Sequence, residues 1–371
     1  MTVAADPPNN PIVLAAGGTG GHLFPAEALA RELLRRGRAV ALVTDRRGHE
    51  FPVAGVPTYR IMTGRLGGGP ISKLIGLTRL GIGVLTAGQL LRRLVPDGVV
   101  GFGGYPSAPT MLAAARMGLP TVIHEQNAVL GRTNKMLAAR VSRIATCFET
   151  VEGVTEAERA KTMRTGNPVR AEFLAVRDRG YDPPHPTGPI RLLVLGGSQG
   201  ARILSQVVPE ALKILPKALQ ARLDVSQQVR AEDMAAVQAA YAGSGIKVEL
   251  QRFFADVPQR LAAAHLQIGR AGGSTVAELT VAGRPAILVP FAAAIADEQT
   301  ANARNLVARG GAWLLPEAEF TPAILSGQLE RILAHPAALA RAAAAAYRLG
   351  EPDATTRLAD LVETVVQERW R

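Results

Sequence analysis

Two stretches of the chain, 179 residues apart, share one pattern, and this repetition limits the folds that the chain can adopt. Residues 12–16 form a short apolar run, a glycine-rich loop follows at 17–22, and residues 25–36 have helical periodicity. The same order returns at 191–195 and 196–202, again followed by a helical pattern. A buried strand that passes through a glycine loop into a helix is typical of parallel α/β folds. The chain therefore contains this unit twice.

Further buried strands are predicted at 39–44, 99–102 and 121–123, separated by helical or loop sequence. Strands that alternate with helices form a parallel sheet covered on both faces. At about 150 residues per domain, a length of 371 residues suggests two domains. The predicted fold class is α/β, with two Rossmann-like, doubly wound parallel-sheet domains.

A proline-rich stretch at 181–189 marks the boundary between the two copies, because four prolines in nine residues cannot continue a helix. The sequence predicts a first domain over 1–170, a linker over 171–189 and a second domain over 190–345. The Ala-rich end of the chain is helical in pattern. Its last segment, 346–371, is expected to pack back on the first domain.

Charge is divided unequally between the two halves. Residues 1–170 contain 21 Lys or Arg and 11 Asp or Glu, a net charge of +10, whereas residues 171–371 contain 21 and 20, a net charge of +1. A basic half beside a nearly neutral half favours an anionic partner, either nucleic acid or an acidic lipid surface. Solvated surface charge without a partner is the alternative. Aromatic residues make up only 4% and no nucleic-acid-binding motif is recognisable, which argues against nucleic acid.

Three features that the sequence lacks narrow the class of protein further. Cys147 is the sole cysteine, so a disulfide framework and a Cys-rich zinc site are excluded. Residues 1–11 lack the basic start and the apolar run of a signal peptide. The uncharged segment 80–91 is far shorter than the ~20 residues that cross a bilayer. A cytoplasmic protein is therefore expected.

Both glycine loops are candidate anion sites. Backbone N–H groups in such loops approach a phosphate closely, and the following helix adds a favourable dipole. Neither loop is a Walker A loop, and the first does not fit G-x-G-x-x-G because Leu23 occupies the third glycine position. Asp45, at the end of the next strand, could still hold a ribose diol as in dehydrogenases. Tight turns without a ligand are the other alternative.

A third glycine turn, at 269–278, places Glu278 within about the first turn of the following helix. Its carboxylate can accept two hydrogen bonds from a ribose 2′,3′-diol, or it can simply complement the helix dipole. Gln299, in the polar cluster 297–303, can bind sugar hydroxyls, while Asp297 in the same cluster can cap the next helix.

Two of the six histidines lie at predicted carboxyl ends of strands, where ligands collect in parallel sheets. His22 ends the first glycine loop, and His124 opens the sequence His-Glu-Gln-Asn at 124–127. This sequence is not a zinc helix, because no second histidine follows at the H-E-x-x-H spacing. His22 and His124 are therefore the histidines in candidate functional positions, with a structural role for His22 as the alternative.

Seven motifs occur in order between residues 12 and 310, namely 17–22, 101–107, 124–127, 133–135, 166–170, 196–202 and 272–278. Together they resemble the MurG family of N-acetylglucosaminyltransferases, which convert lipid I to lipid II in peptidoglycan synthesis. The resemblance implies a GT-B fold, with two Rossmann-like domains and the active site in the cleft between them. It also implies an inverting, metal-independent transfer of N-acetylglucosamine from UDP-N-acetylglucosamine (UDP-GlcNAc) to the 4-hydroxyl of lipid I, with no cofactor. Glu298 departs from the pattern, because family members often carry His there.

By that resemblance, the second domain binds the donor and the first binds the acceptor and the membrane. Inversion needs a general base on the acceptor hydroxyl, for which His22 is the first choice and Glu125 the second. The predicted donor-binding residues are Thr19, Gly20, Gly21, Asn127, Arg170, Ser198, Gln199, Gly200, Phe253, Gly272, Gly273, Ser274, Glu278 and Gln299. The predicted acceptor-binding residues are Gly17, Gly18, Gly103, Gly104, Tyr105 and Asn134.

The implied partners are UDP-GlcNAc, lipid I, an anionic membrane surface and proteins of cell-wall synthesis or division, with no nucleic acid. Two alternatives remain open. The same fold can act on a diacylglycerol or a soluble aglycone, and a nucleotide-binding module can use the basic half without chemistry.

Residues 71–94 carry apolar side chains interleaved with Lys73, Arg79, Arg92 and Arg93, in partly helical spacing. This pattern favours a surface segment that dips into an anionic membrane, and a buried core helix is the alternative. The membrane interpretation predicts a peripheral protein at the cytoplasmic face of the cell membrane.

Overall fold

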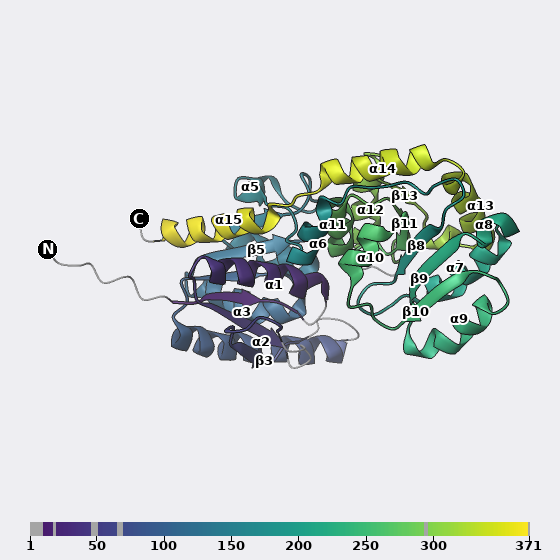
Figure 1. The fold of residues 1–371 in the computed structure, drawn as a ribbon. Coiled ribbons are helices and arrows are strands. Elements are labelled where there is room, and N and C mark those ends of the chain that lie inside the picture. The colour runs from purple at the N-terminus through teal and green to yellow at the C-terminus, as the bar shows by residue number, and fades with distance from the viewer. Residues whose placement is uncertain (1–9, 18–19, 46–50, 65–69, 293–295, 370–371) are drawn as a thin grey trace. The chain divides into compact units, whose positions relative to one another are not determined.

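The computed structural model describes residues 10–17, 20–45, 51–64, 70–292 and 296–369, without the side chains of 70–74. The chain divides into two compact units, Met1–Arg170 with Asp353–Arg371 and Ala171–Pro352 (Figure 1). Each unit contains one parallel sheet with helices on both faces, which confirms the predicted α/β class.

The first unit contains a seven-stranded sheet with the order β3-β2-β1-β4-β5-β6-β7. Its strands are β1 (Ile12–Ala15), β2 (Val40–Asp45), β3 (Thr58–Ile61), β4 (Gly98–Gly101), β5 (Thr121–Glu125), β6 (Arg143–Thr146) and β7 (Thr162–Arg164). Its helices are α1 (Gly20–Arg35), α2 (Pro70–Leu94), α3 (Gly104–Arg116), α4 (Arg132–Leu137), the 3-10 turn η1 (Ala138–Arg140), α5 (Glu156–Arg159) and α15 (Ala354–Glu368).

The two faces of this sheet bury separate cores. Ile12 and Leu14 of β1 belong to the core that contains α1 and α15, whereas Val13 and Ala15 belong to the core that contains α2 and α3. Every residue of β1 is therefore buried, whichever way it points. This double burial explains why the strand is a continuous apolar run and not an alternating one.

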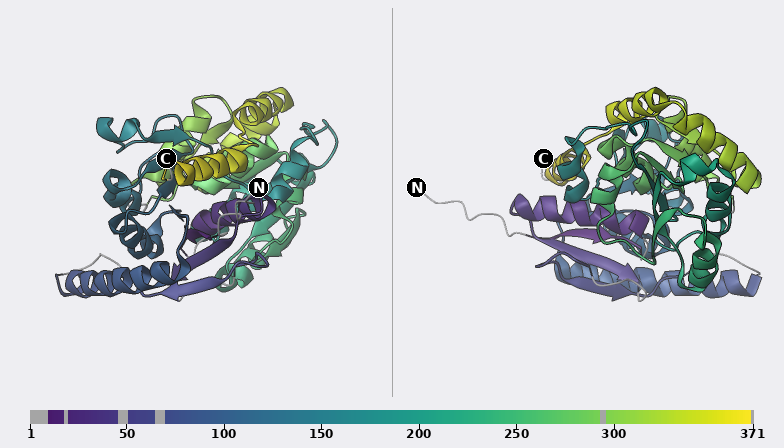
Figure 2. Two further views of the ribbon diagram at one scale, coloured as in Figure 1. Left: turned by 90° about the vertical axis from the view of Figure 1, so that its left-hand side faces the viewer. Right: turned by 45° about the vertical axis from the view of Figure 1, so that its right-hand side comes forward.

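Helix α15 comes from the end of the chain but lies in the first unit, beside α1 (Figures 1 and 2). Its Leu358 and Val362 are buried in the same core as α1. Arg36, just after α1, pairs with Asp360 at 2.7 Å and with Glu363 at 2.6 Å. Apolar burial and ion pairs thus both hold α15 on α1.

Helix α2 has two different faces. Ala87 and Leu91 are buried in the core of the first unit. Ile75, Ile82 and Leu85 lie on the opposite side by helical spacing and are 47%, 44% and 71% exposed. The alternative of a buried core helix therefore holds for one face only, and membrane contact of the exposed face stays a prediction.

The second unit contains a six-stranded sheet with the order β10-β9-β8-β11-β12-β13. Its strands are β8 (Ile190–Leu195), β9 (Leu223–Gln228), β10 (Lys247–Gln251), β11 (Leu266–Gly269), β12 (Ala286–Leu288) and β13 (Ala312–Leu314). Its helices are α6 (Ala171–Arg177), α7 (Arg202–Ile214), α8 (Lys217–Gln220), α9 (Met234–Tyr241), α10 (Val257–Ala263), α11 (Gly273–Ala282), α12 (Glu298–Val307), α13 (Pro322–Leu333) and α14 (Pro336–Leu349), with the 3-10 turns η2 (Ala231–Asp233) and η3 (Glu317–Glu319).

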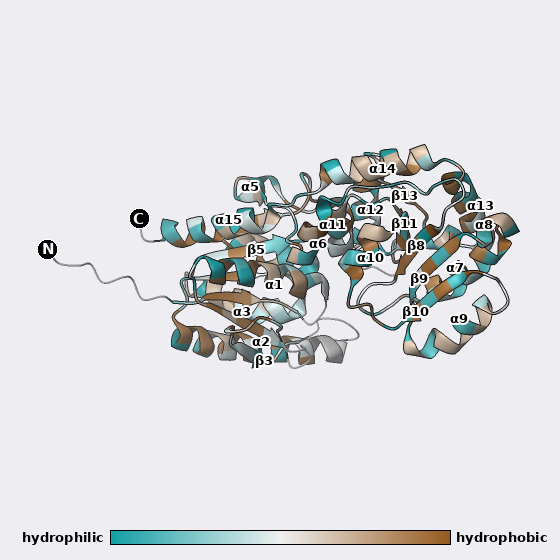
Figure 3. Cartoon of the chain, viewed as in Figure 1, coloured by the Kyte–Doolittle hydropathy of each residue, from teal (hydrophilic) through white to brown (hydrophobic). Residues whose placement is uncertain are grey.

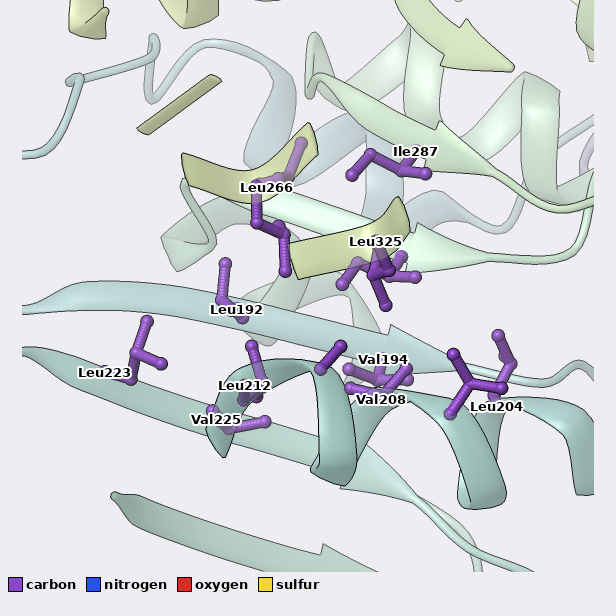
Figure 4. Packing of buried hydrophobic residues seen from close by; sticks show 14 of the residues in the cluster. Leu192, Val194, Leu204, Val208, Leu212, Leu223, Val225, Leu266, Ile287 and Leu325 are labelled. Carbon is purple, nitrogen blue, oxygen red and sulfur yellow. The ribbon is translucent and has the colours of Figure 1, made fainter. Parts of the chain in front are cut away.

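The core of the second unit lies between β8 and the helices that cover it. Figure 4 shows Leu192 and Val194 of β8 close to Val208 and Leu212 of α7. The β8 strand is mostly hydrophobic in Figure 3, as a strand buried on both faces requires.

The predicted linker, 171–189, begins with a helix. Phe173 and Val176 of α6 are buried in the second unit, and only the residues after the helix, 178–189, contain neither helix nor strand. The prolines that suggested the boundary lie in that second part. Phe173 and Val176 are spaced i and i+3, so they form one buried face of this short helix, a pattern that the proline content of the linker does not reveal.

Both sheets reverse their order beside the strand that precedes the glycine loop. Strand β1 lies between β2 and β4, and β8 lies between β9 and β11. In doubly wound sheets, ligands bind outside the carboxyl ends of the strands at such a switch point. Each unit therefore has one candidate binding region, which includes its glycine loop.

Candidate active site

The candidate site of the first unit gathers four chain segments at the carboxyl ends of β1, β4 and β5. His22 is the third residue of α1, Gly103 and Gly104 follow β4, and Asn134 belongs to α4. The sequence 124–127 begins inside β5 and continues past its end. Gly18 and Thr19, which the sequence places in this site, lie outside the described residues.

Gln126 links the histidine to the sheet. His22 Nδ1 lies 3.2 Å from Gln126 Oε1. Gln126 Nε2 lies 3.1 Å from Phe102 O, 3.0 Å from His124 O and 2.9 Å from His124 Nδ1. Burial lowers the pKa of His22 from its ordinary value of 6.5, although the negative charge of Glu125 acts in the opposite direction. The His22 ring is therefore neutral at pH 7.

Two glycines face the other edge of this ring. Gly103 and Gly104 have φ angles of 82° and 71°, which side chains other than glycine rarely adopt. A Cβ on Gly104 would lie 3.3 Å from His22 Nε2, and one on Gly103 would lie 3.5 Å from His22 Cε1. The backbone conformation thus favours glycine at both positions, and a Cβ on Gly104 would also be in tight contact with the imidazole.

The Glu125 carboxylate, 2% exposed, accepts four hydrogen bonds. Oε1 accepts from Asn127 N at 3.0 Å and from Asn127 Nδ2 at 3.1 Å. Oε2 accepts from Gly131 N at 2.9 Å and from Asn134 Nδ2 at 2.9 Å. Both oxygens are thus occupied in ordering the loop between β5 and α4. Within the part of the chain that the structure describes, the buried Asn134 Oδ1 has no hydrogen-bond partner.

His124 is fully buried beneath the site. Its Nε2 lies 3.1 Å from Gly166 O, and its ring packs at a tilt on Phe102, with 5.6 Å between centroids. Burial lowers the pKa of His124 to about 4. The sequence singled out His124 by its position at a strand end, and the structure makes it a support for Gln126.

Two other predicted residues of the first unit lie on helix borders. Tyr105 is the second residue of α3 and is half-buried. Arg170 stacks on Phe24 of α1, with its Cζ 4.5 Å from the ring centroid. This stacking holds the Arg170 guanidinium beside the first helix of the unit.

In the second unit, the loop after β8 has the geometry of an anion cradle. A Cβ on Gly196 would collide with Ala201 N, and Gly197 and Gly200 have φ angles of 84° and 69°. This tight path leaves Ser198 and Gln199 exposed. Backbone N–H groups of such a loop, at the start of a helix such as α7, favour phosphate.

Among the predicted donor residues of the second unit, Gln299 is fixed by two backbone N–H groups. Gln299 Oε1 accepts from Ala271 N at 3.3 Å and from Phe291 N at 3.1 Å. It thereby ties the turn after β11 to the loop after β12. Gly272 caps α11, and Gly273 and Ser274 are its first residues.

The expected position of Glu278 was wrong by one helical turn. Glu278 is the sixth residue of α11, because the helix begins at Gly273. It is half-buried there. The side chain of Asp297 also differs from expectation: it does not cap α12 but accepts from Thr300 Oγ1 at 2.6 Å.

Sequence reasoning assigned no role to two residues that shape these sites. Gln126 was only part of a motif, yet it bonds the ring of His22. Arg270, 9% exposed, pairs with Glu317 at 2.7 Å and donates to Val289 O at 3.1 Å. Arg270 directly follows the buried strand β11, and a charged residue in that position was the available signal.

The predicted donor residue Phe253 lies just after β10 and is 64% exposed. Among the described residues, no group of three or more His, Cys, Asp or Glu side chains could hold a metal ion.

Two Rossmann-like units in one chain, each with a glycine loop at its switch point, form the architecture of GT-B glycosyltransferases. The chain belongs to glycosyltransferase family 28. Residues 12–146 match the N-terminal domain of this family, and residues 191–364 match its C-terminal domain. The chain is therefore a hexosyltransferase by family, as its motifs imply.

A protein of Rhodospirillum centenum is 56% identical over 354 residues, which cover 95% of this chain and 93% of the relative. That relative is named UDP-N-acetylglucosamine–N-acetylmuramyl-(pentapeptide) pyrophosphoryl-undecaprenol N-acetylglucosamine transferase. A protein of Zymomonas mobilis with the same name is 51% identical over 95% of this chain and 92% of its own length. The crystal structure of MurG from Acinetobacter baumannii matches with a TM-score of 0.76 and 30% identity, over 95% of this chain and 99% of that one. These findings confirm the family that the motifs indicate.

Proposed function

We propose that this enzyme transfers N-acetylglucosamine from UDP-GlcNAc to the 4-hydroxyl of N-acetylmuramyl-pentapeptide pyrophosphoryl-undecaprenol (lipid I), which forms lipid II. The observation that carries the proposal is the 56% identity, over 95% of the chain, to a relative named for this transfer. The basic charge of residues 1–170 supports it, because the acceptor is a pyrophosphate at an anionic lipid surface.

The proposed mechanism is a single displacement with inversion. His22 Nε2 takes the proton of the acceptor hydroxyl while the oxygen of that hydroxyl attacks the anomeric carbon of the donor sugar. The bond from the anomeric carbon to the UDP oxygen breaks, and UDP leaves with the electron pair. The lowered pKa of His22 and the two glycines beside its ring support this role for the base. Glu125 is proposed to position Asn127 and Asn134, since four donors occupy its two oxygens.

The second unit is proposed to bind the donor. The loop with Ser198, Gln199 and Gly200 would hold the diphosphate and stabilise the charge that develops on leaving UDP, because helix N-termini favour anions. Glu278 would accept from the ribose hydroxyls, and Gln299, fixed by two backbone N–H groups, would bind the sugar. Metal independence stays a prediction, as do the donor contacts of Gly20, Gly21, Arg170 and Phe253.

The first unit is proposed to bind the acceptor and to attach peripherally to the cytoplasmic face of the membrane. In the described part of the chain, no helix combines the length and hydropathy that a membrane span requires. Helix α2 exposes Ile75, Ile82 and Leu85, which by helical spacing lie on the same side as the exposed Arg79. Apolar side chains together with basic charge on one helix face support binding at an anionic lipid surface.

An acceptor panel tests the proposed function. Purified full-length enzyme and labelled UDP-GlcNAc are offered a short-chain lipid I analogue, a diacylglycerol and a soluble aglycone, each with and without EDTA. We expect transfer to the lipid I analogue alone, with the β configuration and without loss in EDTA. Transfer to the diacylglycerol or the aglycone, with none to the lipid I analogue, would overturn the proposal.

A further inference from the structure

The amide of Gln126 is oriented from the side opposite His22. Its Nε2 lies 3.1 Å from Phe102 O and 3.0 Å from His124 O. Carbonyl oxygens only accept hydrogen bonds, so the group beside them must be the NH2 of the amide. The oxygen of the Gln126 amide therefore faces His22 Nδ1, at 3.2 Å.

This orientation decides which nitrogen of His22 carries the proton of the neutral ring. An amide oxygen only accepts, so His22 Nδ1 must donate. His22 Nε2 then keeps its lone pair. That atom lies 3.3 Å from the position of a Cβ on Gly104, so it is on the glycine-lined side of the ring.

The ring of His124 continues this chain of hydrogen bonds further into the protein. His124 Nε2 donates to Gly166 O at 3.1 Å, and His124 Nδ1 accepts from Gln126 Nε2 at 2.9 Å. A protonated His124 would present N–H at both nitrogens and would repel the Gln126 NH2. Burial lowers the pKa of His124 to about 4, so the ring stays neutral and the directions of these hydrogen bonds are kept.

We propose that Gln126 is a positioning residue that holds His22 in the Nδ1–H tautomer, so that the lone pair of Nε2 points to the acceptor side. This inference rests on the proposed function, in which His22 Nε2 takes the acceptor proton. In Ser-His-Asp triads a carboxylate orients the histidine, and a wrong tautomer there abolishes most of the activity. The amide of Gln126 fixes the tautomer of the histidine as that carboxylate does, but it carries no negative charge. The negative charge that raises the pKa of His22 comes from Glu125, and the His124 ring beneath is neutral.

The tautomer can be measured directly in the full-length protein. Long-range ¹H–¹⁵N spectra of ¹⁵N-histidine-labelled enzyme, assigned with a His22→Gln variant, distinguish a protonated Nδ1 from a protonated Nε2. We expect His22 to be protonated at Nδ1 in the unmodified chain. A protonated Nε2 would overturn the proposal, and this result needs no variant of Gln126.

Gln126→Met tests the consequence for catalysis, since it keeps the length of the side chain but can neither donate nor accept these bonds. We expect the Nε2–H form of His22 to appear and turnover to fall at least about tenfold, up to the 10²–10⁴ that a positioned base contributes. The KM for UDP-GlcNAc should not change. Gln220→Met is the matched control, because the buried amide of Gln220 also donates to two carbonyls, Lys213 O at 2.7 Å and Leu215 O at 2.6 Å. It should leave turnover unchanged.

A double-mutant cycle separates positioning from a structural role. If Gln126 acts through His22, Gln126→Met should cause no further loss of turnover in a His22→Ala background. An equal further loss would overturn the proposal. Full turnover of His22→Ala would instead refute the general base of the proposed function, and the catalytic role of Gln126 with it. A protonated Nε2 in an enzyme that depends on His22 would refute the role of Gln126 alone.

Discussion

Glu125→Gln tests whether this carboxylate supports the site or takes the acceptor proton itself. Glu125 Oε1 holds the two donors of Asn127, and Oε2 holds Gly131 N and Asn134 Nδ2. In the variant, an NH2 group replaces one oxygen and faces two donors. Two of the four hydrogen bonds are therefore lost, whichever way the new amide turns.

The expected change in the free energy of local opening follows from the two lost hydrogen bonds. A hydrogen bond to a charged group contributes about 1.5–3 kcal/mol, so two lost bonds should lower the free energy of local opening by about 3–6 kcal/mol. Each 1.4 kcal/mol is about tenfold in an equilibrium, so the amides of Asn127 and Gly131 should exchange with deuterium roughly 10²–10⁴ times faster. Hydrogen–deuterium exchange read by mass spectrometry or NMR measures this change.

The control is Glu156→Gln, which removes an exposed carboxylate of α5 that pairs with the exposed Arg159. Such surface pairs contribute little, so exchange there should change by less than about tenfold. Unchanged exchange at Asn127 and Gly131 in Glu125→Gln, together with a loss of turnover of 10²–10⁴, would refute the reasoning. Glu125 would then be the general base.

Three further predictions address the base, the donor and the membrane. Because burial lowers the pKa of His22, turnover should persist as the pH falls to 6.5 and decline below that pH, as the ring becomes protonated. His22→Ala should remove this decline and lower turnover about 10²–10⁴-fold. Near-normal turnover of the variant would contradict the assignment of His22 as the base. Glu278→Ala should weaken UDP binding by about 1.5–3 kcal/mol without unfolding the protein, and calorimetry that finds unchanged affinity would remove Glu278 from the ribose site. Replacement of Ile75, Ile82 and Leu85 by Ser should reduce sedimentation with anionic vesicles at low salt. The thermal transition should stay in place, because these side chains are exposed. Equal sedimentation would place the membrane surface elsewhere.

The strands and the glycine loops could be predicted because their signals are local. A run such as 12–16 is apolar in every position only when both faces of the strand are buried, and the structure buries all of β1. The family followed from motifs that lie at these strand ends. Local patterns gave the wrong start for a helix. Helix α1 begins at Gly20, five residues before the start expected at Pro25, because two glycines in its first turn hide the helical pattern.

The support of the site could not be predicted from local sequence. The role of Gln126 depends on Phe102 O, 24 residues away in the chain, and that of His124 on Gly166 O, 42 residues away. Residue types within the motif at 124–127 show that polar side chains gather there, but not which of them bonds which. The parallel pairing of β4 with β5 brings Phe102 to Gln126, and the pairings of β5 with β6 and of β6 with β7 bring Gly166 to His124.

The place of α15 in the first unit affects the order in which the protein is completed during synthesis. The first unit begins to emerge from the ribosome before the second, yet the helix that covers α1 is translated only after the whole second unit. All of the second unit is made in between, so it can fold while one core of the first unit still lacks its cover. A nascent chain, or one shortened after Pro352, would expose the apolar surface beneath Leu358 and Val362 and would be prone to aggregation.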